Sequence, residues 1–238
     1  MRIRRDVVAG ILAVATVGCG GSGSASLDTD DQKASYAIGL GMGENLKPTG
    51  DHLDLAALRV GIEDALAERD TRVPEEELQA IMTVFNQTIQ AEMQAEQEAL
   101  AQTNTEEGAA YLAENGGREE VTTTASGLQY EVLRDGDGAS PGAGDQATIN
   151  YRGTLIDGTE FDSSYERGEP ATFQVGGVIP GFAEGLQLMT VGSHYRFVIP
   201  GDIAYGPGGN GRDIGPNATL IFEVELLELP AAQEAPGE

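Results

Sequence analysis

The segment INYRGTLIDGTEFDSS, residues 149–164, decides the fold of the second half of the chain. It opens with an alternation of apolar and polar residues, in which Ile149 and Tyr151 are apolar members. The pair Asp157-Gly158 then marks a turn. A period of two is typical of a β-strand that buries one face. These residues therefore predict a strand followed by a turn.

The same alternation continues in the rest of this half. Apolar residues recur at every second position in residues 128–132, 147–151, 195–199 and 220–226, and turn signals rich in Gly, Pro and Asp separate the segments. One short helix is expected at residues 181–188. Several antiparallel strands with one short helix predict an α+β domain of about 110 residues.

Residues 31–115 have the period of helices instead. Pro74 suits the first position of a helix, and the three glutamates that follow it place negative charge at the positive end of the helix dipole. An apolar stripe then runs from Leu78 to Leu100 without Gly or Pro. Continued to Asn115, this helix would be about 60 Å long at about 1.5 Å per residue. A compact helical unit of about 90 residues is too small to cover so long a helix alone. The apolar stripe is therefore interpreted as a surface that packs against other helices or against a partner.

Two shorter features lie ahead of this helix. Asp54 precedes apolar residues spaced by three and four and is expected to cap a helix. Gly39, Gly41 and Gly43 spell G-x-G-x-G, but no strand precedes them, as a nucleotide-binding loop would require. Close packing between helices or between chains is the preferred interpretation of these glycines.

The N-terminus has the organisation of an export signal. Residues 1–5 form a basic segment with three arginines, and the apolar run at residues 7–17 is too short for a membrane span of about 20 residues. Cys19 follows, and then a Gly/Ser-rich segment. This resembles a bacterial lipoprotein signal, in which the cysteine is acylated, and it implies a periplasmic envelope protein anchored to the outer membrane by lipid on Cys19. An ordinary cleaved signal with an accidental cysteine is the alternative.

Composition excludes several classes of function. The 238 residues include 14 basic and 39 acidic ones, a net charge of −25, which argues against a nucleic-acid partner. Two His and one Cys exclude a Cys₄ or Cys₂His₂ zinc site and any disulfide within the chain. The sequence offers little support for nucleophilic catalysis, because Cys19 belongs to the signal and no G-x-S-x-G nucleophile motif occurs. No metal or other cofactor is expected.

The spelling of the second half identifies a family. The quoted segment resembles the FKBP-type peptidyl-prolyl cis-trans isomerases, as do ATFQVGGVIPGFAEGLQLMTVGS (171–193), IPGDIAYG (199–206) and IGPNATLIFEVELL (214–227). The helical half, including SYAIG at 35–39, resembles the macrophage infectivity potentiator branch of that family. The resemblance implies an antiparallel half-barrel sheet wrapped on a short helix, after an all-helical dimerisation region. It also implies a periplasmic or surface homodimer that acts on unfolded or proline-containing protein clients.

The resemblance assigns a pocket for the prolyl ring. Its catalytic residues would be Phe161, Phe222 and the polar pair Asp162 and Tyr205. Its substrate-binding residues would be Tyr151, Phe173, Val178, Ile179, Phe182 and, as a flap, Ile214. Binding of macrolide inhibitors is also implied, although Phe182 stands where the family usually has Trp at the pocket floor. Without this spelling, the same residues would be interpreted simply as the core of the domain.

Such a pocket suits rotation about an X–Pro bond, which has a barrier of about 18–20 kcal/mol. The transition state has lost amide resonance, so its less dipolar carbonyl is better tolerated in a dry apolar cavity. A few kcal/mol of differential binding would give about 10³–10⁵-fold acceleration without a nucleophile, base or metal. The Ile179 N–H and the Tyr205 hydroxyl are expected to hold substrate carbonyls, and Asp162 to orient the twisted amide.

These observations together predict six segments along the chain. They are a lipoprotein-type signal peptide at 1–18, a flexible tether at 19–30, a helical dimerisation domain at 31–115, a linker at 116–125, the isomerase domain at 126–229 and a disordered tail at 230–238. Two other functions fit the same segments. One is a chaperone or binding module whose isomerase pocket is vestigial, and the other is a surface-exposed adhesion lipoprotein.

Overall fold

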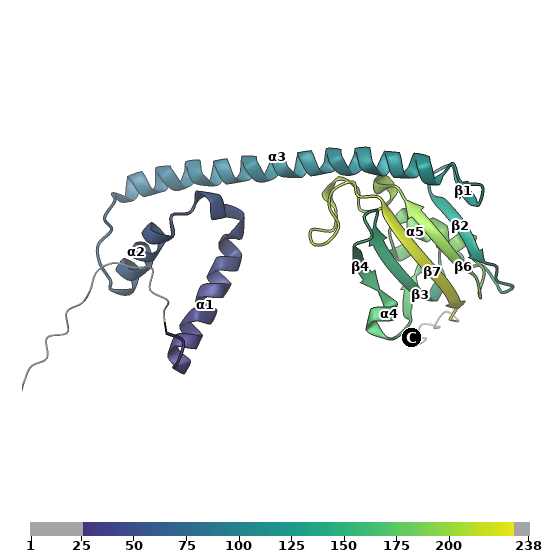
Figure 1. Cartoon of the computed structure of the whole chain (residues 1–238), viewed down its shortest axis with the longest axis horizontal. Coiled ribbons are helices and arrows are strands. Elements are labelled where there is room, and N and C mark those ends of the chain that lie inside the picture. The colour runs from purple at the N-terminus through teal and green to yellow at the C-terminus, as the bar shows by residue number, and fades with distance from the viewer. Residues whose placement is uncertain (1–25, 231–238) are drawn as a thin grey trace, which may run out of the picture. The chain divides into compact units, whose positions relative to one another are not determined.

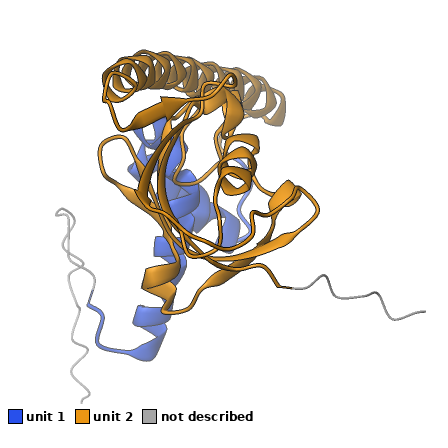
Figure 2. Ribbon diagram, turned by 90° about the vertical axis from the view of Figure 1, so that its right-hand side faces the viewer, with its two compact units in different colours: residues 1–71 blue, residues 72–238 orange. Residues whose placement is uncertain are grey.

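The structure is a computed structural model that describes residues 26–230. The predicted signal peptide, Cys19 and the tail from residue 231 onward lie outside the described residues. The chain divides into two compact units, residues 1–71 and residues 72–238 (Figure 2). The long helix therefore belongs to the same unit as the sheet, whereas its period alone grouped it with the helices that precede it.

Residues 26–71, the described part of the first unit, contain three helical segments, α1 (Asp30–Leu46), the 3-10 helix η1 (Lys47–His52) and α2 (Leu55–Leu66). The Asp54 carboxylate accepts hydrogen bonds from the N–H groups of Ala56 and Ala57 at 2.8 and 3.0 Å, which confirms the predicted cap of α2. None of the apolar residues described in this unit is buried. The described residues of the first unit thus form no apolar core of their own.

The second unit begins with the long helix α3 (Glu75–Asn115), which is continuous for 41 residues and confirms the predicted helix. It begins one residue later than expected, because Pro74 is the N-cap and Glu75 the first helical residue. At the other end the helix stops at Asn115, with Gly116 as its C-cap. Along residues 26–230, no helix combines the length and the apolar character that crossing a membrane requires.

A seven-stranded antiparallel sheet follows α3 (Figure 1). Its strands are β1 (Val121–Thr123), β2 (Gln129–Arg134), β3 (Gln146–Leu155), β4 (Glu160–Ser163), β5 (Ala171–Gln174), β6 (His194–Ile199) and β7 (Leu220–Glu228). The order across the sheet is β1-β2-β6-β7-β3-β4. β7 pairs with most of β3, whereas on the other side of β3 its first residues pair with β5 and its last with β4. Because β4, β5 and β7 all pair with β3, these four strands lie next to one another in the sheet.

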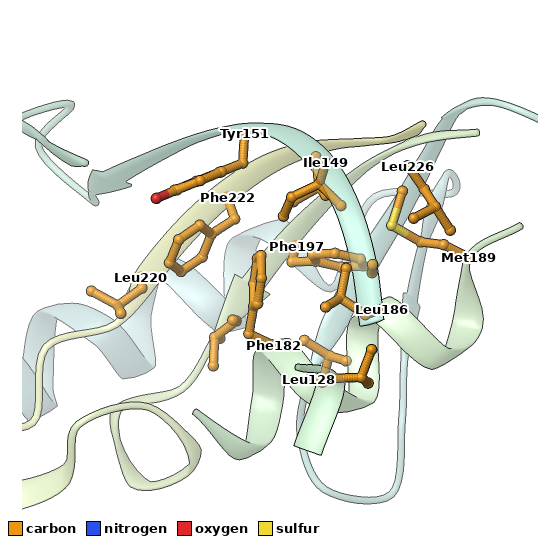
Figure 3. Close-up of a cluster of buried hydrophobic side chains, with 14 of the residues drawn as sticks. Leu128, Ile149, Tyr151, Phe182, Leu186, Met189, Phe197, Leu220, Phe222 and Leu226 are labelled. Carbon is orange, nitrogen blue, oxygen red and sulfur yellow. The ribbon is translucent and has the colours of Figure 1, made fainter. Parts of the chain in front are cut away.

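The core lies between the sheet and α5 (Pro180–Leu188). Ile149 of β3, Phe197 of β6 and Leu186 of α5 are fully buried and lie together in Figure 3. Alternate residues of β3 and β7 are buried, which confirms the strands predicted there from the period of two. The short helix expected at residues 181–188 is also confirmed, with one more residue at its start.

Two short elements depart from the expected pattern. β1 lies within residues 116–125, which were expected to be a linker, and pairs with β2. The one-turn helix α4 (Ser164–Arg167) directly follows β4 where no helix was expected. These elements have three and four residues, too few to show a period in the sequence.

Candidate active site

The structure brings all of the predicted pocket residues to one cavity of about 520 Å³, a volume in the range typical of small-molecule sites. The residues come from four strands, from the start of α5 and from the loop between β6 and β7. They are Tyr151 (β3), Phe161 and Asp162 (β4), Phe173 (β5), Val178, Ile179 and Phe182 (α5 and the residues before it), Tyr205 and Ile214 (the loop) and Phe222 (β7). Segments up to about seventy residues apart in sequence therefore line the same cavity.

Aromatic rings form the apolar part of the cavity. The ring centroids of Phe182 and Phe222 are 4.7 Å apart, and the Phe161 ring stands edge-on to Phe222 at 5.5 Å. Gly153 of β3 makes this packing possible, because a Cβ there would lie 2.7 Å from the Phe161 ring and 2.9 Å from the Phe222 ring. In Figure 3, Tyr151, Phe222 and Phe182 lie close to one another within the buried cluster. The pocket is thus continuous with the hydrophobic core.

A small polar network lies at the edge of these rings. The Tyr151 hydroxyl donates to Asp162 Oδ2 at 2.5 Å and accepts from Arg167 Nη2 at 2.8 Å. Arg167 also forms an ion pair with Asp162, and its guanidinium carbon lies 5.4 Å from the centre of the Tyr151 ring. Burial, and then the hydrogen bond to Asp162, raise the pKa of Tyr151 to about 12. The phenol is therefore fully protonated at neutral pH and orients the carboxylate.

The sequence did not predict Arg167 in the site. The residue ends the one-turn helix α4, which begins after the Ser163 cap and stops at Gly168 with φ 75°. The hydrogen bond to Tyr151, and then the one to Asp162, raise the pKa of Arg167, so the guanidinium stays charged. The sequence signal that could have pointed to Arg167 is Asp162, because a carboxylate next to apolar side chains is stabilised by a nearby cation. Arg167, five residues later, is the next cation in the sequence.

Ile179 is the N-cap of α5. Its carbonyl accepts the first helical hydrogen bonds, from the N–H groups of Phe182 and Ala183, both at 3.0 Å. Its own N–H precedes the helix and takes no part in these bonds. Pro180 occupies the first helical position, where its fixed φ suits the start of a helix. Ile179 also lines the cavity, so its N–H is the backbone donor to consider for a bound substrate.

The loop between β6 and β7 forms the remaining side of the cavity. Its flap residue Ile214 is buried, whereas the Tyr205 side chain is 42 % exposed. The side-chain oxygen of Asn210 accepts from the N–H groups of Arg212 and Ile214, both at 2.9 Å, and holds the tip of the loop in a turn. Asn210, Arg212 and Asp213 also line the cavity, and none of the three was predicted.

Comparison with known proteins agrees with this geometry. The family model described as FKBP-type peptidyl-prolyl cis-trans isomerase matches residues 138–227. The model described as the domain amino terminal to FKBP-type peptidyl-prolyl isomerase matches residues 31–132. The helical half and the sheet thus match the two parts of one protein architecture.

Individual relatives match over most of their length. The outer membrane protein MIP of Legionella longbeachae is 42% identical over 207 residues, which cover 87% of this chain and 89% of the relative. The FKBP-type 22 kDa peptidyl-prolyl cis-trans isomerase of Escherichia coli is 44% identical over 205 residues, covering 86% and 98%. The crystal structure of FkpA from Escherichia coli matches with a TM-score of 0.66 at 37% identity, covering 86% of this chain and 98% of FkpA. The chain therefore belongs to the FKBP-type peptidyl-prolyl cis-trans isomerases, within the branch that contains the macrophage infectivity potentiators.

Proposed function

We propose that this isomerase accelerates X–Pro rotation in protein clients of the cell envelope by desolvating the amide in its apolar pocket, and that it works as a dimer. The observation that carries the mechanism is the cavity itself, in which Phe161, Phe182 and Phe222 face one space of about 520 Å³. A prolyl ring held among these rings excludes water from the amide. The rotated amide has a weaker dipole than the planar one, so the apolar cavity stabilises it relative to the ground state.

Three polar groups orient the substrate in this mechanism. The Ile179 N–H donates to one substrate carbonyl, and the exposed Tyr205 hydroxyl donates to another. The Asp162 carboxylate, held by Tyr151 and Arg167, faces the amide as it leaves planarity. None of these groups transfers a proton in the reaction, so they act only by position and charge.

Tyr205→Phe and Asp162→Ala are each expected to lower kcat/KM by about three- to tenfold, because each removes one polar contact worth about 1 kcal/mol while the apolar cavity stays. A protease-coupled assay with a prolyl peptide measures the change. Tyr165→Phe serves as the control, because Tyr165 is 53% exposed and does not line the cavity. Full activity in both pocket variants would show that the polar pair has been assigned wrongly. Rapamycin is expected to inhibit the wild type in the same assay by occupying the cavity.

The proposal of a dimer rests on the exposed apolar side chains of the first unit. Residues 26–71 bury no apolar side chain, yet Ile38 is 65%, Leu55 73% and Leu66 83% exposed. A helical unit without a core is not stable by itself, and large exposed apolar patches mark interaction surfaces. Gly39, Gly41 and Gly43 lie on α1, and apart from the adjoining backbone of α1 itself, a Cβ added to any of them would meet no described atom within 4 Å. These glycines are therefore free to accept the close approach of a second chain.

Anchoring by lipid on Cys19 is proposed from the signal-like N-terminus, and one of the relatives carries the name outer membrane protein. We expect Cys19→Ser to leave the membrane fraction while its isomerase rate is unchanged, because the sheet domain is more than a hundred residues away. Acylation with more than one chain gives stable membrane attachment, whereas one chain gives only marginal binding. Fractionation followed by the peptide assay measures both quantities. Wild-type protein without lipid, recovered in the soluble periplasmic fraction, would contradict the anchor and leave the enzyme assignment intact.

A further inference from the structure

The end of α3 packs against the sheet domain through one face of the helix. Asn115 Nδ2 donates to Gln129 Oε1 at 2.8 Å, and Gln129 Nε2 in turn donates to the Leu112 carbonyl at 2.8 Å. Arg196 of β6 donates to the Tyr111 hydroxyl at 2.8 Å. In Figure 1 the last part of α3 runs along the sheet domain. The helix is thus fixed to the domain by polar contacts with β2 and β6.

The same face of α3 also contacts residues 215–219, the arm of the loop between β6 and β7 that leads into β7. Asn104 Nδ2 donates to the carbonyl of Pro216, a buried residue, at 2.7 Å. The backbone of Gly215 lies so close to the helix that a Cβ there would be 3.1 Å from Asn104 Nδ2 and 3.3 Å from Leu100 Cδ2. One turn further along α3, a Cβ at the buried Gly108 would overlap with Thr219 Oγ1. Both ends of residues 215–219 therefore rest on α3.

This arm is connected to both loop residues of the pocket. Pro216 is two residues from Ile214, the buried flap of the cavity. The next residue, Asn217, donates its N–H to the Gly206 carbonyl at 2.8 Å, and Gly206 directly follows Tyr205. A displacement of Pro216 is thus transmitted to Ile214 along the chain and to Tyr205 through the Asn217–Gly206 hydrogen bond.

We propose that Asn104 is a positioning residue of the isomerase site, which fixes the loop bearing Tyr205 and Ile214 through its hydrogen bond to Pro216. The long helix then supports the loop that forms one side of the pocket, without lining the pocket itself. The proposal rests on the pocket assigned above, because the loop matters for catalysis only if Tyr205 and Ile214 act there. Asn104 touches neither the cavity nor substrate and acts only through the loop.

Asn104→Asp tests the proposal in the full chain, because the two side chains have the same shape but the carboxylate has no donor for the Pro216 carbonyl. Kcat/KM for a prolyl peptide is expected to fall about fivefold, the effect of about 1 kcal/mol lost with one partly buried hydrogen bond. Asn104→Ala is expected to lose a similar factor. Because alanine raises helix propensity, that loss would not come from melting of α3. Asn86→Asp is the matched control, since Asn86 is exposed on the same helix and receives the same charge.

Hydrogen exchange distinguishes a positioning role from a general loss of stability. The amides of Ile214 and Asn217, which are hydrogen-bonded within the loop, are expected to exchange about fivefold faster in Asn104→Asp. The amide of Phe197 in the central strand β6 is expected to be unchanged. Wild-type activity in Asn104→Asp would overturn the proposal, as would lost activity with unchanged loop exchange. If the wild type itself does not isomerise prolyl peptides, the proposed function fails, whereas the exchange measurement still decides whether Asn104 holds the loop.

Discussion

Phe222→Ala is expected to lower kcat/KM for a prolyl peptide by about 100-fold, the equivalent of about 2.7 kcal/mol in the barrier. Phe222 lines the cavity, and its ring packs against Phe182 at 4.7 Å and against Phe161 at 5.5 Å. Removing the ring admits water beside the amide and leaves the prolyl ring without one wall. Desolvation is the main source of the proposed acceleration, so this loss exceeds that expected for either polar residue.

Loss of activity must be separated from loss of folding, because truncating a buried Phe to Ala costs about 3–5 kcal/mol of stability. Phe222→Leu and Phe197→Leu form a matched pair for this purpose. The two phenylalanines are direct partners in the register of β6 and β7 and are both buried, but only Phe222 lines the cavity. Both leucine variants are expected to lower the melting temperature, and only Phe222→Leu to lower the catalytic rate substantially. Equal rates in the two variants would mean that the pocket has been misplaced.

Ile38→Asp is expected to convert the proposed dimer to a monomer at micromolar concentration and to reduce catalysis of protein refolding by about tenfold, with the peptide rate unchanged. Ile38 is 65% exposed on α1 in the single chain, so a carboxylate there stays hydrated in the monomer. In the proposed dimer the same charge would be buried without a partner, which costs several kcal/mol. A dimer also presents two pockets to one client, so a client bound at one pocket has a raised effective concentration at the other.

Light scattering and refolding of a proline-limited client measure the two effects. Gln187→Asp is the control, because Gln187 is exposed on α5, away from the first unit in sequence, and does not line the cavity. A monomeric wild type at micromolar concentration would refute the proposed dimer. A dimeric Ile38→Asp protein would place the interface elsewhere on the chain.

The residues predicted for the pocket line one cavity, and they were predicted from sequence motifs that are specific to a family. Alternation alone predicted that Tyr151 and Phe222 lie on buried strand faces, but it did not show that β3 and β7 are neighbours. That pairing joins segments about seventy residues apart, and the periodicity of residues within each segment carries no information about it. The family resemblance supplied the missing long-range information, and the cavity contains every residue it named.

The polar contacts of the site were not predictable in the same way. Arg167 lies on a helix of four residues, too short for a period, and its role depends on the folded positions of Tyr151 and Asp162. The contact between Asn104 and Pro216 joins a side chain to a backbone carbonyl 112 residues away. Such a contact has no signature in composition or spacing. For the same reason, the change of period near residue 126 did not reveal that the end of α3 packs on the sheet domain.

The pH dependence of kcat/KM tests most directly the central claim that the pocket works by desolvation without proton transfer. Measured by NMR exchange on a prolyl peptide, kcat/KM is expected to stay constant within about twofold between about pH 6 and pH 9, because no step moves a proton. Tyr151 does not titrate in this range, since burial and the hydrogen bond to Asp162 raise its pKa to about 12, and its hydroxyl keeps the carboxylate in place throughout. A bell-shaped profile, or a tenfold change per pH unit within this range, would show general acid–base catalysis and contradict the account.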